Sequence, residues 1–314
     1  MATIYLGGGT PSVLDDQQIL RLLTALPKAE EVTIESNPGD ISPARLQLWR
    51  QAGANRLSIG VQSFNDSMLS LIGRRHTAEQ AVQAVRDAQQ AGFRNISIDL
   101  IYGLPDQSIG DWRHELECAL QLGVQHLSVY CLTYEAGTPL TILRDRGIVR
   151  EADEDLANDM LALAHLMLTQ AGFEHYEVSN FARPRFRSRH NSNYWNFTPY
   201  IGLGAAAHSF DGHTRSWNVA DIDAYMDAIL QGTLPSSSEV LTADDRYNEQ
   251  VMLRLRTVEG LDLTTIVEPY RTHCVSEAES LVAQRLLEYI SPTNLRATVA
   301  GINLLNLIIE KLMV

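Results

Sequence analysis

Cysteine is scarce in this sequence. Its 314 residues include three, Cys118, Cys131 and Cys274, and no two are close enough in sequence to form a loop that binds a metal cluster. An odd number of widely spaced cysteines does not indicate a disulfide framework; it is typical of free thiols in a reducing compartment. We therefore expect a cytoplasmic protein.

The sequence also lacks long apolar runs and an excess of basic charge. No segment is long enough for a membrane span, and the N-terminus has no basic region followed by an apolar core. The formal net charge is −13, which repels a phosphate backbone, so we expect no nucleic-acid partner. The hydrophobic fraction of 45% is ordinary for a globular protein, and the length suits one large or two modest domains.

Strand-like and helical segments alternate through residues 3–132. Apolar, β-rich runs predict strands at 3–6, 32–35, 56–61, 95–101 and 126–132. Helices are predicted between them at 12–26, 42–52, 77–91 and 109–122, the first starting at a capping pair of Ser12 and Asp15. This alternation is typical of βαβ units with parallel strands. Because five strands are awkward for a closed barrel, we predict an α/β fold with a partial parallel (β/α) barrel over residues 1–149.

The pattern changes after residue 150. A long amphipathic helix is predicted at 153–171, a strand at 175–178, an irregular Arg-rich stretch at 181–200 and a linker at 232–238. Further helices are predicted at 243–258, 275–287 and 301–312, with a strand pair that turns at 291–294. We predict a second α/β region over residues 150–235 and a small winged-helix-like α+β module over residues 236–314.

Five motifs follow the predicted strands of the barrel. They are GGGTPS at 7–12, ESNP at 35–38, GVQSF at 60–64, DLIYGLP at 99–105 and YCLT at 130–133. A parallel barrel collects such strand ends on one rim, where small-molecule sites are built. The motifs therefore predict a binding site at this rim.

Two acidic residues of these motifs suit a polar ligand. Glu35 ends an apolar strand, where a carboxylate binds an ammonium group or pairs with a core arginine. Asp99 lies inside an apolar strand, and a buried carboxylate is costly unless it is hydrogen-bonded. A ribose diol would supply two donors to Asp99; the alternative is a structural hydrogen bond to a neighbouring strand or helix.

The remaining candidates complete such a site. Gly8 and Gly9, followed by Thr10, allow the backbone to approach a ligand closely. Gln62 can serve the same diol, and Arg74 can hold a carboxylate in a forked pair, with a solvated loop arginine as the alternative. Together they suit S-adenosylmethionine, with an apolar edge near Tyr130 for the adenine.

In this order the five motifs resemble those of radical S-adenosylmethionine proteins. More narrowly, the chain resembles the group that holds oxygen-independent coproporphyrinogen III oxidases and HemW-type heme chaperones, over nearly its whole length. The resemblance implies that Gly8, Gly9, Thr10 and Glu35 hold the methionyl amine and that Arg74 holds the carboxylate. It further implies that Gln62 and Asp99 contact the ribose and that Tyr130 and Thr133 contact the adenine.

A further motif distinguishes the two branches. Residues 190–195, HNSNYW, fit the pattern HNxxYW, which is associated with heme binding in HemW-type proteins and is lacking in the oxidases. Histidine is a common axial ligand of heme iron, and aromatic rings offer flat apolar faces to a porphyrin. We take His190, Asn191, Tyr194 and Trp195 as heme-site candidates, with His208 as a second histidine candidate near the S-adenosylmethionine pocket. A structural hydrogen bond is the alternative for His190.

Four arginines precede this motif: Arg183, Arg185, Arg187 and Arg189. They suggest contacts with heme propionates, with a mobile solvated loop as the alternative.

One family element is missing from the sequence. The family's first barrel strand carries three closely spaced cysteines that bind a 4Fe–4S cluster, and this chain begins at what resembles the second strand. We therefore expect a barrel that lacks its first strand, in an N-terminally truncated member, with the cluster present only in the full-length protein. Radical catalysis by this chain is not expected, because cluster ligation needs thiolates at that site.

The resemblance implies a heme-binding chaperone that passes heme to acceptors such as respiratory-chain hemoproteins, and that meets a membrane only through them. Porphyrinogen decarboxylation by an oxygen-independent coproporphyrinogen III oxidase is the alternative. A third reading is an unrelated barrel enzyme with Glu35 and Asp99 as an acid/base pair.

Overall fold

The computed structural model describes residues 2–314. The chain divides into two compact units, one extending to His190 and the other spanning Asn191–Val314. The three-part division at residues 149 and 235 stays a prediction; the division between compact units falls at neither of these positions. In the described part of the chain, no helix is both long and apolar enough to cross a membrane.

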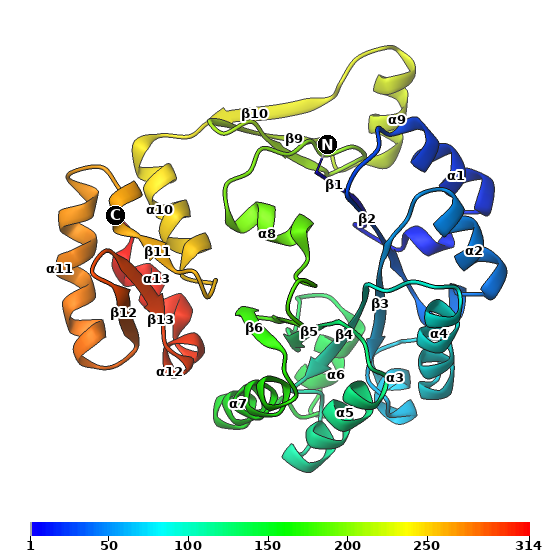
Figure 1. Ribbon diagram of the computed structural model, residues 1–314, viewed down its shortest axis with the longest axis horizontal. Helices are drawn as coiled ribbons and strands as arrows, with labels where there is room; N and C mark the ends of the chain where they lie inside the picture. Colours follow the sequence, from blue (N-terminus) through cyan, green and yellow to red (C-terminus); the bar gives the residue numbers. More distant parts are fainter. Residues whose placement is uncertain (1) are drawn as a thin grey trace. The chain divides into compact units, whose positions relative to one another are not determined.

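A curled sheet of seven strands organises the first unit (Figure 1). Its parallel strands are β1 (Thr3–Leu6), β2 (Glu31–Ser36), β3 (Arg56–Gln62), β4 (Ile96–Tyr102) and β5 (His126–Cys131), paired in chain order. Two antiparallel strands extend the sheet beyond β5, first β7 (Asn180–Ala182) and then β6 (Glu174–Glu177). The partial barrel predicted from the sequence is thus confirmed. The expectation of an irregular stretch from residue 181 was wrong for β7.

Seven α-helices follow or connect these strands. They are α1 (Asp16–Ala25), α2 (Pro43–Gln51), α3 (Asp66–Leu71), α4 (Ala78–Gln90), α5 (Ile109–Gln121), α6 (Pro139–Asp145) and α7 (Glu154–Gln170). Helix α4 begins at a capping box of Thr77 and Gln80, as its sequence indicates. Helix α1 begins at Asp16 rather than at the predicted residue 12, with a capping box of Asp15 and Gln18. The pairing predicted between Ser12 and Asp15 was therefore wrong.

The two faces of the sheet differ in chemistry. Alternate strand residues such as Ile34, Ile59 and Ile98 are fully buried in one apolar core with Trp49 of α2 and Trp112 of α5. Helices α1 to α5 lie along this side of the sheet (Figure 1). The opposite face is buried but polar, with Glu31, Thr33, Arg56, Ser58, Ser97, His126 and Ser128. Since strand side chains alternate between faces, this polar set lines the inside of the half-barrel.

The second unit holds two small antiparallel sheets. In the first, β8 (His208–Phe210), β9 (Thr214–Asn218) and β10 (Ser236–Val240) pair in the order β10-β9-β8, and α9 (Ile222–Leu230) connects β9 to β10. Strand β10 contains the second half of the linker predicted at residues 232–238. That part of the prediction was wrong, because Ser236 pairs with Asn218 and the following residues continue the ladder.

The C-terminal segment alternates helices and short strands. Its elements are α10 (Ala243–Arg254), β11 (Leu261–Asp262), α11 (Tyr270–Ala283), β12 (Leu287–Ser291), β13 (Asn294–Ala297), α12 (Val299–Asn303) and α13 (Leu305–Leu312). The strands pair in the order β11-β13-β12, and the hairpin turns where the sequence predicts. The single helix predicted at residues 301–312 is two helices that meet at Leu304. The likeness to a winged helix stays a prediction.

Candidate functional site

The glycine-rich loop after β1 lies beside Glu35. Gly8 and Gly9 have φ values of 76° and 129°, and a Cβ on either would meet nothing within 4 Å. Their backbone is therefore open on one side, as a ligand cradle requires. A Cβ on Gly7 would come within 2.5 Å of the Tyr5 ring and 3.0 Å of the Glu35 carboxyl carbon. The Tyr5 hydroxyl donates to Oε1 of Glu35 at 2.6 Å, which fixes that carboxylate next to the loop.

Arg45 fastens this loop to helix α2. Its Nη1 donates to the carbonyl oxygens of Ser12 and Asp40, both at 2.8 Å, and its Nη2 donates to the carbonyl of Leu14 at 2.7 Å. Its Nε pairs with Asp16 at 2.9 Å. One guanidinium thus restrains the segment that directly follows the glycines. The sequence analysis missed this role, because the partners are mainly backbone carbonyls.

Gln62 and Arg74 both lie near Gly60 at the end of β3. Gln62 is buried with a φ of 69°, and its side-chain nitrogen lies 2.9 Å from where a Cβ on Gly60 would stand. Nη1 of Arg74 donates to Oδ1 of Asn37 at 3.3 Å, and Asn37 in turn borders Gly60. Burial lowers the pKa of Arg74, and the charge of Asp99 opposes that shift. Arg74 is therefore not the solvated loop arginine considered as the alternative.

Asp99 faces the inside of the half-barrel near a second carboxylate. Burial raises its pKa to about 6; a hydrogen bond from Ser128 opposes this shift, and the charge of Glu35 adds to it. Ser58 is a further donor at 3.4 Å. Partial burial and the charge of Asp99 raise the pKa of Tyr130 to about 12. Glu35, Asp99 and Tyr130 are thus close enough to influence one another.

The charged groups of this site match those of S-adenosylmethionine. The neighbouring carboxylates of Glu35 and Asp99 suit a ligand that carries a sulfonium, an ammonium and a ribose diol. The guanidinium of Arg74 suits the carboxylate of that ligand. Thr133 is exposed in the loop after β5, and the described residues include no hydrogen-bond partner for its side chain. Its adenine contact, like the other individual roles, stays a prediction.

The cysteines do not fit a 4Fe–4S cluster. Cys118 lies in α5, Cys131 at the end of β5 and Cys274 in α11. Within residues 2–314 no three histidine, cysteine, aspartate or glutamate side chains are grouped as metal ligands.

Arg56 is a buried charge that the sequence analysis did not single out. Its side chain is 1% exposed, and Nε and Nη1 have no hydrogen-bond partner among the residues that the structure describes. Its charge acts on Asp99, His126 and His190. The only signal in the sequence is an arginine that opens an otherwise apolar strand.

The first residue of the HNxxYW motif is anchored to the half-barrel. The motif lies on α8 (Arg189–Trp195), which corrects the irregular stretch predicted there. The backbone N–H of His190 donates to Glu31 at 2.9 Å, its Nδ1 lies 2.9 Å from the Thr3 hydroxyl, and its ring stacks on Tyr5 at 4.8 Å. Burial and the charge of Arg56 lower its pKa to about 4. The imidazole is therefore neutral at physiological pH.

The other motif residues belong to the second unit. The ring of Tyr194 meets that of Tyr200 edge-on at 4.7 Å. Nε1 of Trp195 is buried and has no hydrogen-bond partner in the described part of the chain. Asn191 is half-buried on the same helix.

Three of the four preceding arginines are engaged within the first unit. Arg183 donates to the carbonyl of Ala171 at 3.1 Å, Arg187 pairs with Glu174 at 3.0 Å and Arg189 pairs with Glu30 at 2.5 Å. Arg185 is exposed. A mobile solvated loop does not describe Arg183, Arg187 and Arg189, and their protein partners weaken the idea that all four arginines contact propionates.

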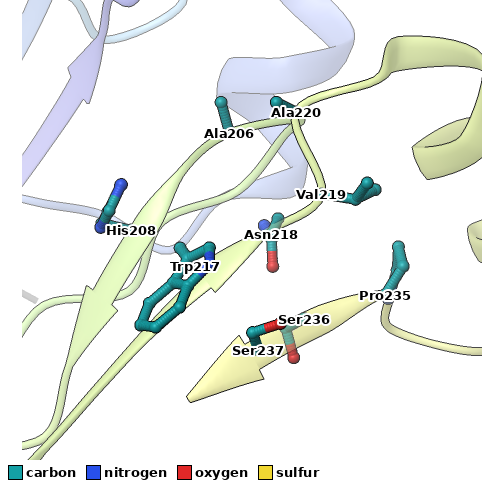
Figure 2. A pocket seen from close by; sticks show the side chains of 9 residues that line it. All are labelled: Ala206, His208, Trp217, Asn218, Val219, Ala220, Pro235, Ser236 and Ser237. Atoms are coloured by element: carbon teal, nitrogen blue, oxygen red, sulfur yellow. The ribbon is translucent and has the colours of Figure 1, made fainter. Parts of the chain in front are cut away.

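His208 lines a cavity of about 550 Å³ in the second unit (Figure 2). The cavity lies over β8, β9 and β10 and is lined by Ala206, His208, Trp217, Asn218, Val219, Ala220, Pro235, Ser236 and Ser237. The sequence analysis named this histidine without the surrounding residues, because they come from three strands and three loops.

The half-barrel and its rim define a radical S-adenosylmethionine protein, and the model of the Radical SAM superfamily matches residues 2–119. The heme chaperone HemW of Lactococcus lactis is 37% identical over 297 residues, which cover 93% of this chain and 77% of that protein. HemW of Escherichia coli is 38% identical over 269 residues, with coverages of 82% and 69%. The chain belongs to the HemW family.

A solved structure supports the same fold. Coproporphyrinogen III oxidase (HemN) from Escherichia coli, described as a radical SAM enzyme, matches with a TM-score of 0.83 and 25% identity. The match covers 100% of this chain and 78% of that one. The α/β fold with a partial barrel, predicted from the sequence, is confirmed by this match.

Proposed function

We propose that this chain binds heme and transfers it to heme-accepting proteins, on a scaffold that also binds S-adenosylmethionine. The observation that carries the proposal is the HNxxYW segment, whose histidine is fixed by Thr3, Tyr5 and Glu31 of the half-barrel in a family of proteins named heme chaperones. Acceptors such as respiratory-chain hemoproteins fit this role, in the cytoplasm and at a membrane only through the acceptor.

The heme roles follow from side-chain chemistry. His190 offers a neutral imidazole to the iron, because its pKa of about 4 keeps it unprotonated at physiological pH. Tyr194 and Trp195 offer aromatic faces to the macrocycle, and the amide of Asn191 orients its polar edge.

The half-barrel residues have separate binding roles. Gly8, Gly9 and Thr10 approach the ligand with their backbone, and Glu35 binds its ammonium group. Arg74 binds the carboxylate, Gln62 and Asp99 bind the ribose, and Tyr130 with Thr133 borders the adenine. In the family, a 4Fe–4S cluster supplies the redox chemistry beside this ligand; the described residues of this chain offer no ligand set for it.

Titration with hemin, followed by the Soret band, tests the heme proposal. We expect saturable binding by the wild type and weaker binding by His190→Ala. The matched control is His213→Ala, which removes an exposed histidine from the turn between β8 and β9. An unchanged titration of His190→Ala would show that the assignment of this residue is wrong, and no saturable binding by the wild type would reject the function.

A second candidate is an oxygen-independent coproporphyrinogen III oxidase. The similarity to the HemN structure favours it, since that match covers the whole chain. The test is to supply coproporphyrinogen III, S-adenosylmethionine and a reductant to the purified protein and to analyse the porphyrinogens formed. Decarboxylated product would favour the oxidase over the chaperone.

A further inference from the structure

Two histidines differ from the rest in their contacts. Seven of the nine have a ring nitrogen in a hydrogen bond with another described residue: His76, His114, His126, His165, His175, His190 and His273. The rings of His208 and His213 have no such partner within residues 2–314. Of these two, His208 lines the cavity of the second unit and His213 does not. A ring nitrogen with no protein partner can offer its lone pair to a metal.

The strand register places His208 in a row with an aromatic ring. His208 pairs with Trp217 across β8 and β9, and Trp217 pairs with Ser237 across β9 and β10. Paired residues of neighbouring strands lie on the same face of a sheet. The imidazole and the indole are accordingly 6.2 Å apart with ring planes 30° from parallel.

The next row of residues on the same face is covered by other side chains. It contains Phe210, which is buried, and Arg215, which lies over the Phe210 ring and pairs with Glu249 at 2.7 Å. One end of the face is thus packed within the second unit, while the end with His208 and Trp217 opens into the cavity (Figure 2). The exposure of the His208 imidazole is therefore a local feature of the cavity, because the neighbouring row of this sheet face is covered.

We propose that this cavity binds a metalloporphyrin, with His208 as axial ligand of the metal and Trp217 against the macrocycle. The proposal rests on the proposed heme-binding function and assigns that ligand a site outside the HNxxYW motif. A volume of about 550 Å³ is within the range of small-molecule sites. Val219 and Pro235 add apolar surface, and Ser237, which pairs with Trp217, supplies a hydroxyl group.

Imidazole, indole and apolar edge together favour this ligand class. A flat aromatic ligand without a metal would use Trp217 but would leave His208 without a role. A metal ion alone would need several protein ligands, and the described residues provide no group of three around it. A metal centred in a flat macrocycle brings its own equatorial ligands and needs one axial nitrogen.

The test compares hemin titrations of the wild type, His208→Ala and His213→Ala. Removing a residue that only holds a metal ligand in place already costs about tenfold or more in affinity. Loss of the ligand itself should therefore weaken hemin binding at this cavity by at least about tenfold and leave binding at the HNxxYW motif in place. His213→Ala should titrate as the wild type, and added imidazole should restore the Soret band of His208→Ala. An equal hemin affinity of His208→Ala and wild type would overturn the proposal.

Metal-free protoporphyrin IX separates axial ligation from packing. It has no iron for an axial nitrogen, so His208→Ala should bind it as the wild type does, whereas Trp217→Ala should bind it more weakly. Equal losses of hemin and of the metal-free porphyrin in His208→Ala would reject axial ligation. If the wild type itself does not bind hemin, the proposed function fails. If the wild type binds hemin and His208→Ala binds it equally well, only this inference fails.

Discussion

The ionisation of Asp99 should control the affinity for S-adenosylmethionine. In the proposed site the Asp99 carboxylate would accept hydrogen bonds from both ribose hydroxyls; protonation replaces one acceptor by a donor. With a pKa of about 6, about one-tenth of the side chain is ionised at pH ~5, so the affinity should be about tenfold below its value at neutral pH. Calorimetric titration with S-adenosylmethionine from pH ~5 to pH ~8 measures this dependence.

Neighbouring charges should move the midpoint of this pH profile in defined directions. Arg56→Met removes a cation that lowers the pKa of Asp99, and Ser128→Ala removes a hydrogen bond that also lowers it, so both should shift the midpoint to higher pH. Asp99→Asn should give a flat profile. If the wild type shows no decline toward low pH, or if Asp99→Asn keeps the decline, the coupling of Asp99 to the ribose is refuted.

The same pKa predicts a stability effect of known sign. The folded pKa of about 6 exceeds the ordinary value of 3.8, so the folded chain retains a proton that the unfolded chain releases. The contribution of Asp99 to stability should therefore fall by about 3 kcal/mol as pH rises from 3.8 to about 6. Asp99→Asn should remove this loss, as measured by urea unfolding at several pH values.

Three further predictions test the scaffold. Arg45→Ala should lower the free energy of unfolding by about 3 kcal/mol, because several charge-assisted hydrogen bonds of the glycine-loop segment are lost; Arg45→Lys should recover only part of it. Trp112→Phe removes a buried hydrogen bond to the Met160 carbonyl and should cost about 1 kcal/mol more in urea unfolding than Trp49→Phe, whose indole nitrogen has no partner among residues 2–314. The contribution of His190 to stability should fall as pH drops from 6.5 toward about 4, because the unfolded chain protonates His190 first; His190→Gln should remove this contribution in thermal denaturation.

The barrel strands and their helices could be predicted from sequence because their signals are local. Apolar runs and caps such as Ser42 and Thr77 mark each element within a few residues. The short strand β7 has no such signal: its three residues form a strand because β5 and β6 pair with them. Residues 236–238 likewise form a strand because they pair with β9, although their composition is typical of a linker.

The positions of three candidate residues could be predicted because they lie on strands of the sheet. Glu35, Gln62 and Asp99 follow from the order of the parallel strands, while their ligand roles stay predictions. The roles of Arg45 and Arg56 could not be read from sequence, since one depends on backbone carbonyls and the other on burial. The contact between His190 and Thr3 spans 187 residues and is equally invisible to any local pattern.

Heme transfer from the loaded chain tests the central claim most directly. The protein is loaded with hemin and mixed with an apo-hemoprotein of the respiratory chain, and the spectrum of the acceptor is followed over time. A chaperone should hand heme over at a rate that rises with acceptor concentration and exceeds its release to apomyoglobin. A rate that is independent of the acceptor and equal to passive release would contradict the account.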